Sequence, residues 1–112
     1  MSIRSIARAD LAAATVAAFW LCLTPADAQS PAAQRGLVFV RTNCAQCHAI
    51  DKVSPSPLAA APPFRTLHRK YPVESLEEAL AEGIVTGHPS MPEFRLDLGQ
   101  VNDVITFFKT LE

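Results

Sequence analysis

The sequence predicts an all-α domain of three to four helices, and three observations support that prediction. Apolar residues recur at helical spacing in segments on both sides of a proline-rich stretch. Residues with helix-capping side chains come directly before these segments. No stretch has a convincing alternation of apolar and polar residues, which is the pattern typical of a half-buried strand.

Composition limits the possible function classes. The chain has 112 residues with ten basic and eleven acidic side chains, so its net charge is −1, and 49% of its residues are hydrophobic. A nucleic-acid-binding protein normally carries a marked basic excess, and a disordered acidic tail has far fewer apolar residues. The composition therefore excludes both classes and predicts one globular domain.

Residues 1–28 have the features of a secretory signal peptide. Arg4 and Arg8 give a positively charged start, an apolar run of 13 residues covers 11–23, and residues 26–28 have the small-x-small form that a signal peptidase accepts. We expect Gln29 to be the mature N-terminus, the domain to span residues 29–112, and the protein to be periplasmic.

Two alternatives for this segment fit less well. A helix over the apolar run would be about 20 Å long, shorter than the hydrocarbon core of ~30 Å, so a cleaved signal is favoured over an uncleaved membrane anchor. A lipid anchor at Cys22 would need small residues before it, where the sequence has Phe19, Trp20 and Leu21. We therefore expect no membrane span after cleavage.

The decisive motif is Cys-x-x-Cys-His at residues 44–48. After cleavage Cys44 and Cys47 are the only cysteines, in a chain of 84 residues that is small enough to need a disulfide, a metal or a cofactor. The motif is the attachment signature for c-type haem, in which each thiol forms a thioether and the histidine coordinates the iron as proximal ligand. We expect one covalent haem c, bound through Cys44 and Cys47, with His48 as the proximal ligand.

Three other interpretations of the motif are weaker. A thioredoxin-like redox pair belongs in a βαβ context, and this chain has no convincing strand. A structural zinc site needs a fourth ligand, and neither His68 nor His88 falls at a paired ligand spacing. A structural disulfide would leave His48 without a role.

The first predicted helix starts at residue 31 and leads into this motif. Ser30 is a capping residue, and Pro31 suits the first helical position. One face carries apolar residues at helical spacing, namely Ala33, Leu37, Val40 and Cys44. Gly36 lies inside the helix, where glycine costs ~1 kcal/mol relative to alanine. We therefore expect another element to approach the backbone closely at this position.

The last predicted helix, over residues 97–111, is the expected partner. Asp97 and Gln100 form a capping-box pattern, and Leu96 and Val101 occupy the positions of a hydrophobic staple. The apolar stripe of this helix comprises Val101, Val104, Ile105, Phe108 and Leu111. We expect this stripe to close a crevice around the cofactor.

A loop and two shorter helices are predicted between the first and last helices. Residues 54–63 carry four prolines and cannot be regular structure, so they are expected to wrap the cofactor edge. A short helix is predicted over residues 63–71, with Phe64, Leu67 and Tyr71 on one side. Ser75 and Glu78 form a second capping box at the start of a further helix, which Gly83 would end.

With these motifs in place, the chain resembles a small bacterial class I cytochrome c over residues 31–112. In that family a glycine-bearing first helix leads into Cys-x-x-Cys-His and crosses an aromatic-rich last helix. Gly36 precedes Cys44 by eight residues, as the family's glycine does. The resemblance implies the cytochrome c fold, with its helices wrapped around one covalently attached haem, and implies that Val104 and Phe107 pack on Gly36.

The resemblance also implies the second axial ligand. The family's distal methionine lies in a Met-Pro-x-Phe segment ahead of the last helix, which residues 91–94 match, so Met91 is the expected sixth ligand. After cleavage it is the only methionine in the chain, and it follows His48 by 43 residues. His88, three positions earlier, is the rival candidate.

Two positions depart from the family pattern. The aromatic residue of the first helix is Phe39, one residue earlier than in many relatives. The family's Gly-Pro-x-Leu segment is replaced by Ala-Pro-Pro-Phe at residues 61–64. By similarity, the Pro62 carbonyl accepts the Nδ1 proton of His48, which would fix the ring orientation. A carbonyl group in residues 57–58 is the alternative acceptor.

The predicted function follows from the ligands. With His48 and Met91 both bound, the iron has no open position for a substrate, and this ligand pair raises the reduction potential. The sequence therefore predicts a one-electron carrier rather than an enzyme, a monomer that docks transiently with donor and acceptor redox proteins. A haem-based gas sensor or binder, and a fixed electron-relay subunit of a periplasmic oxidoreductase, are the alternatives. Three basic residues follow the proline-rich loop, namely Arg65, Arg69 and Lys70. They either pair with haem propionates or form a docking patch, or they are simply the solvated face of a helix, and the sequence favours neither interpretation.

Overall fold

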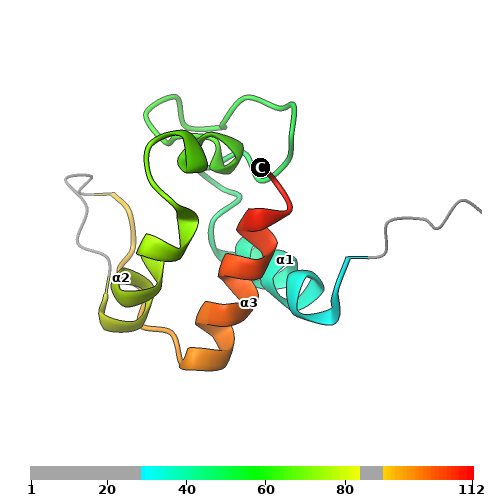
Figure 1. Ribbon diagram of the computed structural model, residues 1–112. Coiled ribbons are helices and arrows are strands. Elements are labelled where there is room, and N and C mark those ends of the chain that lie inside the picture. The colour runs from blue at the N-terminus through cyan, green and yellow to red at the C-terminus, as the bar shows by residue number, and fades with distance from the viewer. Residues whose placement is uncertain (1–28, 84–89) are drawn as a thin grey trace, which may run out of the picture.

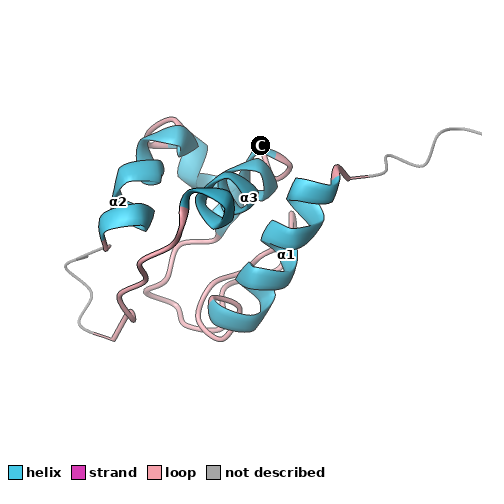
Figure 2. Cartoon of the chain, turned by 90° about the horizontal axis from the view of Figure 1, so that it is seen from below, coloured by secondary structure: helices cyan, strands magenta, loops and turns pink. Residues whose placement is uncertain are grey.

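The computed structural model describes residues 29–83 and 90–112, and this part of the chain contains helices and no strand. The elements, in chain order, are α1 (Pro31–Asn43), the 3₁₀ helices η1 (Phe64–Arg69) and η2 (Val73–Leu76), α2 (Glu77–Glu82) and α3 (Leu98–Lys109). Figures 1 and 2 show α3 lying between α1 and α2, with the long loop after α1 leading to η1. The all-α prediction is confirmed for the described residues.

Two sequence predictions fall on other parts of the chain. The predicted signal peptide at residues 1–28 and the rival ligand His88 both lie outside the described residues. Within the ranges that are described, no helix is long and apolar enough to cross a membrane.

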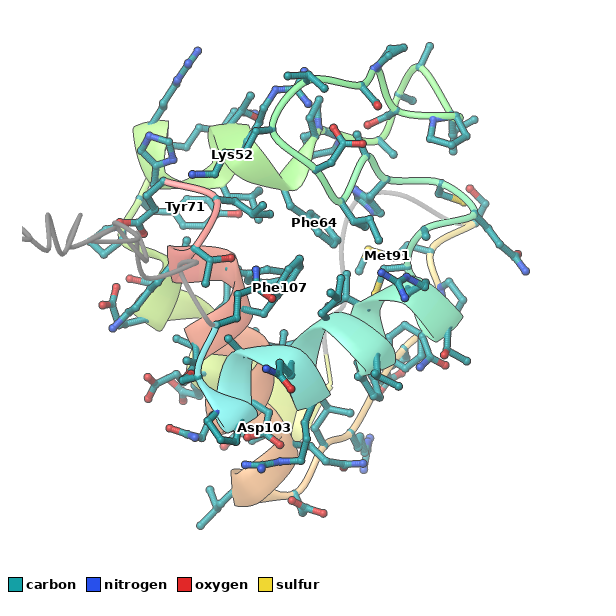
Figure 3. The ribbon with its side chains drawn as sticks, turned by 90° about the vertical axis from the view of Figure 1, so that its right-hand side faces the viewer. Lys52, Phe64, Tyr71, Met91, Asp103 and Phe107 are labelled. Atoms are coloured by element: carbon teal, nitrogen blue, oxygen red, sulfur yellow. The ribbon has the colours of Figure 1, made fainter. Side chains whose placement is uncertain are left out.

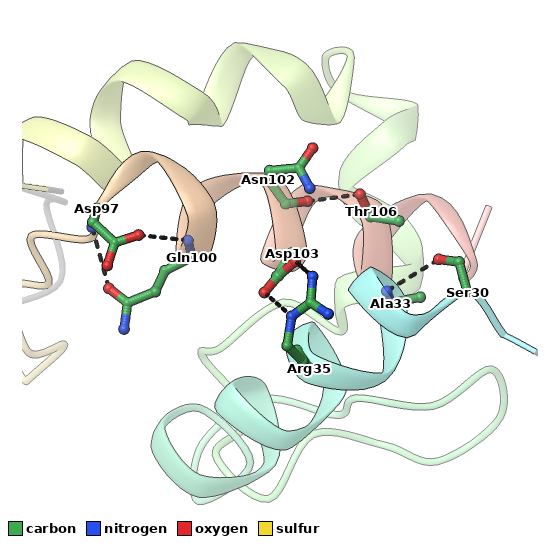
Figure 4. Close-up of polar contacts among 8 residues, drawn as sticks. All are labelled: Ser30, Ala33, Arg35, Asp97, Gln100, Asn102, Asp103 and Thr106. Carbon is green, nitrogen blue, oxygen red and sulfur yellow. Dashed lines mark hydrogen bonds and ion pairs between the residues drawn. The ribbon is translucent and has the colours of Figure 1, made fainter.

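Both long helices begin as the capping residues predict. The Ser30 side chain accepts a hydrogen bond from the Ala33 N–H at 3.2 Å, and Pro31 occupies the first turn of α1. At α3 the capping box is complete, because Asp97 Oδ1 accepts from the Gln100 N–H at 2.9 Å and Gln100 Oε1 accepts from the Asp97 N–H at 3.1 Å. Figure 4 shows both caps.

The two helices meet at Gly36, as the sequence predicts. A Cβ atom at this position would overlap the backbone carbonyl oxygen of Asp103 and would lie 2.8 Å from the Cβ of Phe107. The expected contact with Phe107 is therefore confirmed, whereas the other nearest atoms belong to the backbone of Asp103 rather than to Val104. Only a residue without a side chain permits this separation of the two backbones.

An ion pair lies beside this crossing. The Arg35 guanidinium donates two hydrogen bonds to the Asp103 carboxylate, at 2.7 and 2.8 Å (Figure 4). Arg35 is exposed, but the Asp103 side chain is only 13% exposed. The hydrogen bond and the charge of Arg35 lower the pKa of Asp103 below its usual value. The pair therefore joins α1 to α3 at the level of Gly36.

The helix after residue 72 begins differently from the prediction. The capping box of Ser75 with Glu78 is wrong, because Ser75 lies inside η2 and its N–H already donates to the Pro72 carbonyl at 3.0 Å. An N-cap needs a non-helical backbone, and Pro72 has already started the helical turn. Helix α2 then starts at Glu77 without a side-chain cap and ends at Glu82. Gly83 is the residue at its C-cap, and its φ of 113° suits glycine.

The short helix predicted over residues 63–71 is present as the 3₁₀ helix η1. Its residues Phe64 and Leu67 are buried, since side chains three apart lie on one face of a 3₁₀ helix. Tyr71 lies beyond its end and is 38% exposed. Phe64 and Leu67 join Val40 of α1 and the apolar face of α3 in a single core.

Replacing Gly36 with alanine should destabilise the protein. The added methyl group must push α1 away from Asp103 and Phe107, and overpacking of this kind costs about 1–3 kcal/mol. The measurement is the free energy of unfolding of the haem-loaded protein in denaturant. Gly99→Ala in α3 is the matched control, because its Cβ would meet only the Asp97 side chain, at 3.2 Å. Equal stability of the two variants would contradict the close crossing.

Replacing Asp103 with asparagine should reduce stability in a pH-dependent manner. Because the folded pKa of Asp103 is lowered, its ion pair contributes stability above the unfolded pKa of about 3.9 and loses it as the pH falls further. The difference in Tm between natural protein and variant should therefore be largest near neutral pH and shrink below about pH 4. A constant difference from neutral pH down to acid pH would show that Asp103 acts only through packing.

Candidate functional site

The Cys-x-x-Cys-His segment forms a hydrogen-bonded turn at the end of α1. The Cys44 N–H donates to the Val40 carbonyl at 2.8 Å, and the His48 N–H donates to the Cys44 carbonyl at 3.0 Å. Helix α1 itself ends at Asn43, so this tight turn holds both thiols and the imidazole within one short stretch of chain. Both cysteines are free thiols and half-buried.

A pocket of about 360 Å³ lies beside this turn, in the size range of small-molecule and cofactor sites (~300–1,000 Å³). Most of its lining is apolar and comes from α1, η1, α2 and α3 and from the segment before α3. Phe64 and Met91, both labelled in Figure 3, are among the lining residues. The pocket brings together all four predicted site residues, namely Cys44, Cys47, His48 and Met91.

The imidazole of His48 is fixed from two sides. Its Nδ1 lies 2.8 Å from the Pro62 carbonyl oxygen, which can only accept, so Nδ1 carries the proton and Nε2 is left available to a metal. The ring stacks on Phe64, with centroids 4.5 Å apart, and Phe64 in turn packs on Phe108 of α3 at 4.7 Å. The prediction of Pro62 as acceptor is confirmed over the alternative at residues 57–58.

The proline-rich loop is fixed by short hydrogen bonds. The Ala49 N–H donates to Ser56 Oγ at 3.0 Å, and the Phe64 N–H donates to the Ala49 carbonyl at 3.0 Å. Asp51 Oδ1 accepts from the N–H groups of Val53 and Ser54. A hydrogen bond from the Ser54 side chain, followed by these backbone bonds, lowers the pKa of Asp51 to about 2. The loop that carries Pro62 is therefore held in place, as an acceptor for His48 requires.

Arg65 has a role that sequence reasoning missed. Its Nη1 donates to the Ser54 carbonyl at 2.6 Å, which ties the loop to η1. Arg65 is one of three basic residues considered as contacts for haem propionates or for a partner protein, and it binds the backbone of this domain instead. The other two, Arg69 and Lys70, are exposed. No pattern in the sequence marks a contact of an arginine with a backbone carbonyl eleven residues away.

Met91 lies on the irregular segment that leads into α3 and is half-buried at the pocket. A backbone hydrogen bond and an aromatic contact are among the contacts that join this segment to the helices. The Leu96 N–H donates to the Leu80 carbonyl of α2 at 2.9 Å. The Phe94 ring packs edge-on against Phe39 of α1, with centroids 5.9 Å apart and an interplanar angle of 76°.

The other interpretations of the cysteine motif gain no support from this geometry. Burial, with a smaller effect from Cys47, raises the pKa of the Cys44 thiol to about 11, whereas a redox-active pair needs a lowered thiol pKa. No group of three or more His, Cys, Asp or Glu side chains in residues 29–83 and 90–112 is placed to hold a metal ion, as a zinc site would require.

Comparison with known proteins agrees with the geometry. The family model for cytochrome c matches residues 33–112, which is most of the chain. The chain belongs to the cytochrome c family. No curated protein and no solved structure matches it at a significant level. Membership implies covalent haem c and haem-based electron transfer, and proteins of this family are generally electron carriers rather than enzymes.

The pocket of this cytochrome fits the group that the family implies. Two thiols and one imidazole with a fixed tautomer lie at its wall, and the rest of the lining is mainly apolar, as the faces of a porphyrin require. No buried side-chain nitrogen or oxygen in the described part of the chain lacks a hydrogen-bond partner. The residues present are therefore compatible with a flat apolar group attached beside His48.

The size of the pocket predicts that the chain needs this group to fold. At ~24 cal/mol per Å³, an unfilled cavity of 360 Å³ would cost as much as ~9 kcal/mol. The stability of a small domain is only about 5–15 kcal/mol in total. Replacing both Cys44 and Cys47 with alanine should therefore remove most of the helical circular dichroism. A cooperative, native-like melt in this double variant would contradict the prediction.

Proposed function

We propose that this cytochrome is a periplasmic one-electron carrier whose haem is attached through Cys44 and Cys47 and ligated at the iron by His48 and Met91. The observation that carries the proposal is that all four side chains line one apolar pocket, three of them on the segment after α1 and one on the segment before α3. The haem, when bound, supplies the one-electron chemistry by alternating between ferric and ferrous iron.

The residues on the proximal side of the pocket hold the ring of His48 in one orientation. His48 donates its Nδ1 proton to Pro62 and is held against Phe64, so Nε2 keeps one direction. A second residue in hydrogen-bond contact also raises the basicity of an imidazole ligand. These restraints are independent of the charge on the iron, which suits a site where the ligands must move little when one electron is gained or lost.

The distal side determines the class of function. A methionine thioether favours the ferrous state, raises the reduction potential and occupies the position that a gas or substrate would need. The mainly apolar lining disfavours the extra positive charge of the oxidised state. A carrier needs these properties, whereas a gas sensor or binder needs a weak or absent distal ligand.

Location and partners are part of the same proposal. The signal-peptide features of residues 1–28 support export and cleavage before Gln29. We propose a monomer that meets a donor and an acceptor protein in turn. An apolar side chain at the edge of the pocket supports docking there, because Leu58 lines the pocket and is 37% exposed. Co-purification with a large partner would instead favour a fixed relay subunit of an oxidoreductase.

Replacing Met91 with alanine tests the sixth ligand. The oxidised protein should lose its far-red sulfur-to-iron charge-transfer band, its reduction potential should fall, and the reduced form should bind carbon monoxide. Visible spectra with and without carbon monoxide, and a redox titration, measure these changes.

His88→Ala is the matched control and should change none of these properties. If His88→Ala proves disruptive and Met91→Ala silent, the protein is a bis-histidine cytochrome. If carbon monoxide binds the natural protein as readily as the Met91 variant, the gas-binding alternative replaces the carrier.

A further inference from the structure

The contact between Phe39 and Phe94 joins a fixed helix to the methionine segment. Phe39 lies in the second half of α1, and Phe94 follows Met91 by three residues. Their rings meet edge to face, the arrangement that the charge distribution of two aromatic rings favours. Both rings line the pocket, and both are half-buried.

The position of Phe39 follows from the orientation of α1. Val40 is fully buried, with 0% exposure, and points into the core between the helices. Successive residues of an α-helix are rotated by about 100°, so Phe39 lies to one side of Val40, where it packs against the edge of that core and lines the pocket. A ring at position 39 can therefore contact the segment that carries Met91.

Helix α1 is a firm support for this contact. Gly36, one turn earlier, is in backbone contact with α3, and Arg35 is paired with Asp103. The segment from residue 90 to Asp97, in contrast, contains no helix or strand. A hydrogen bond from this segment to α2 lies five residues after Met91, at Leu96, and the ring of Phe94 contacts α1 only three residues after Met91.

We propose that Phe39 is a positioning residue for Met91, acting through the ring of Phe94. This inference rests on the proposed ligation of the iron by His48 and Met91. A methionine side chain has three rotatable bonds, so its sulfur stays near one point only if the backbone behind it is held. The Phe39–Phe94 contact supplies that restraint and sets how readily another ligand displaces the thioether.

Imidazole binding to the oxidised, haem-loaded protein measures this property, because imidazole competes with the methionine sulfur. Phe39→Leu keeps apolar volume but removes the ring, and should tighten apparent imidazole binding by about two- to tenfold, the range expected for loss of one aromatic pair. Phe39→Tyr keeps the ring and should bind imidazole as the natural protein does. Unchanged binding in Phe39→Leu would overturn the inference.

A double-mutant cycle tests whether the two rings act as one unit. Phe94→Leu should reproduce the effect of Phe39→Leu, and the double variant should be no more sensitive to imidazole than either single variant. Effects that simply add would overturn a role for Phe39 through Phe94.

Val101→Ala is the control for general loss of stability. Val101 is buried in the core but does not line the pocket, so this variant should unfold at a lower temperature while binding imidazole as the natural protein does. Tighter imidazole binding in Val101→Ala would show that any destabilisation loosens the ligand, and would overturn the specific role of Phe39.

The Met91→Ala variant separates this inference from the proposed function. If Met91→Ala leaves the far-red band and imidazole binding unchanged, the ligation is wrong and the inference fails with it. If Met91→Ala changes both properties and Phe39→Leu changes neither, the carrier proposal stands and only the role of Phe39 is overturned.

Discussion

The close approach of two helices at Gly36 is the constraint on which the rest of this small domain depends. The backbone of α1 lies against that of α3 without an intervening side chain, so the end of α1 has one position relative to the aromatic residues of α3. The Cys44–His48 turn begins where α1 ends, and Phe108 of α3 packs behind Phe64, which supports the ring of His48. The positions of the side chains in the Cys44–His48 turn therefore depend on a contact between residues that have no chemical role of their own.

The two sides of the pocket are restrained in different ways. On the His48 side, a network of short hydrogen bonds through Asp51, Ser54 and Arg65 fixes the loop that carries Pro62. On the Met91 side, the described segment is irregular, and its contacts with the helices include an aromatic pair and a backbone hydrogen bond. The described restraints on His48 are therefore mainly hydrogen bonds, whereas those described for the Met91 segment include aromatic packing.

Local signals predicted much of the fold and of the candidate site. Ser30, Asp97 and Gly83 act within a few residues of their own position, so their roles follow from neighbouring sequence. The capping box predicted at Ser75 was wrong because a 3₁₀ turn already begins after Pro72. A capping pattern in the sequence does not show at which of two possible residues a helix begins. The ion pair between Arg35 and Asp103 joins residues that are 68 positions apart in the sequence. It could not be predicted without knowing how α1 crosses α3. The four predicted site residues needed only the motif and the family resemblance, whereas the packing of Phe39 on Phe94 needed the three-dimensional arrangement.

The separation of α1 and α3 along the chain also gives the molecule an order of assembly. The capped start of α1 and the 44–48 turn each close over a few residues, which is fast. Docking of α3 closes a much longer loop, and contacts of that kind form late. Phe108, which lines the same pocket as Cys44 and Cys47, joins that pocket only when α3 docks. A rigid planar molecule that meets both sulfurs before this step does not have to pass the face of the pocket that α3 forms.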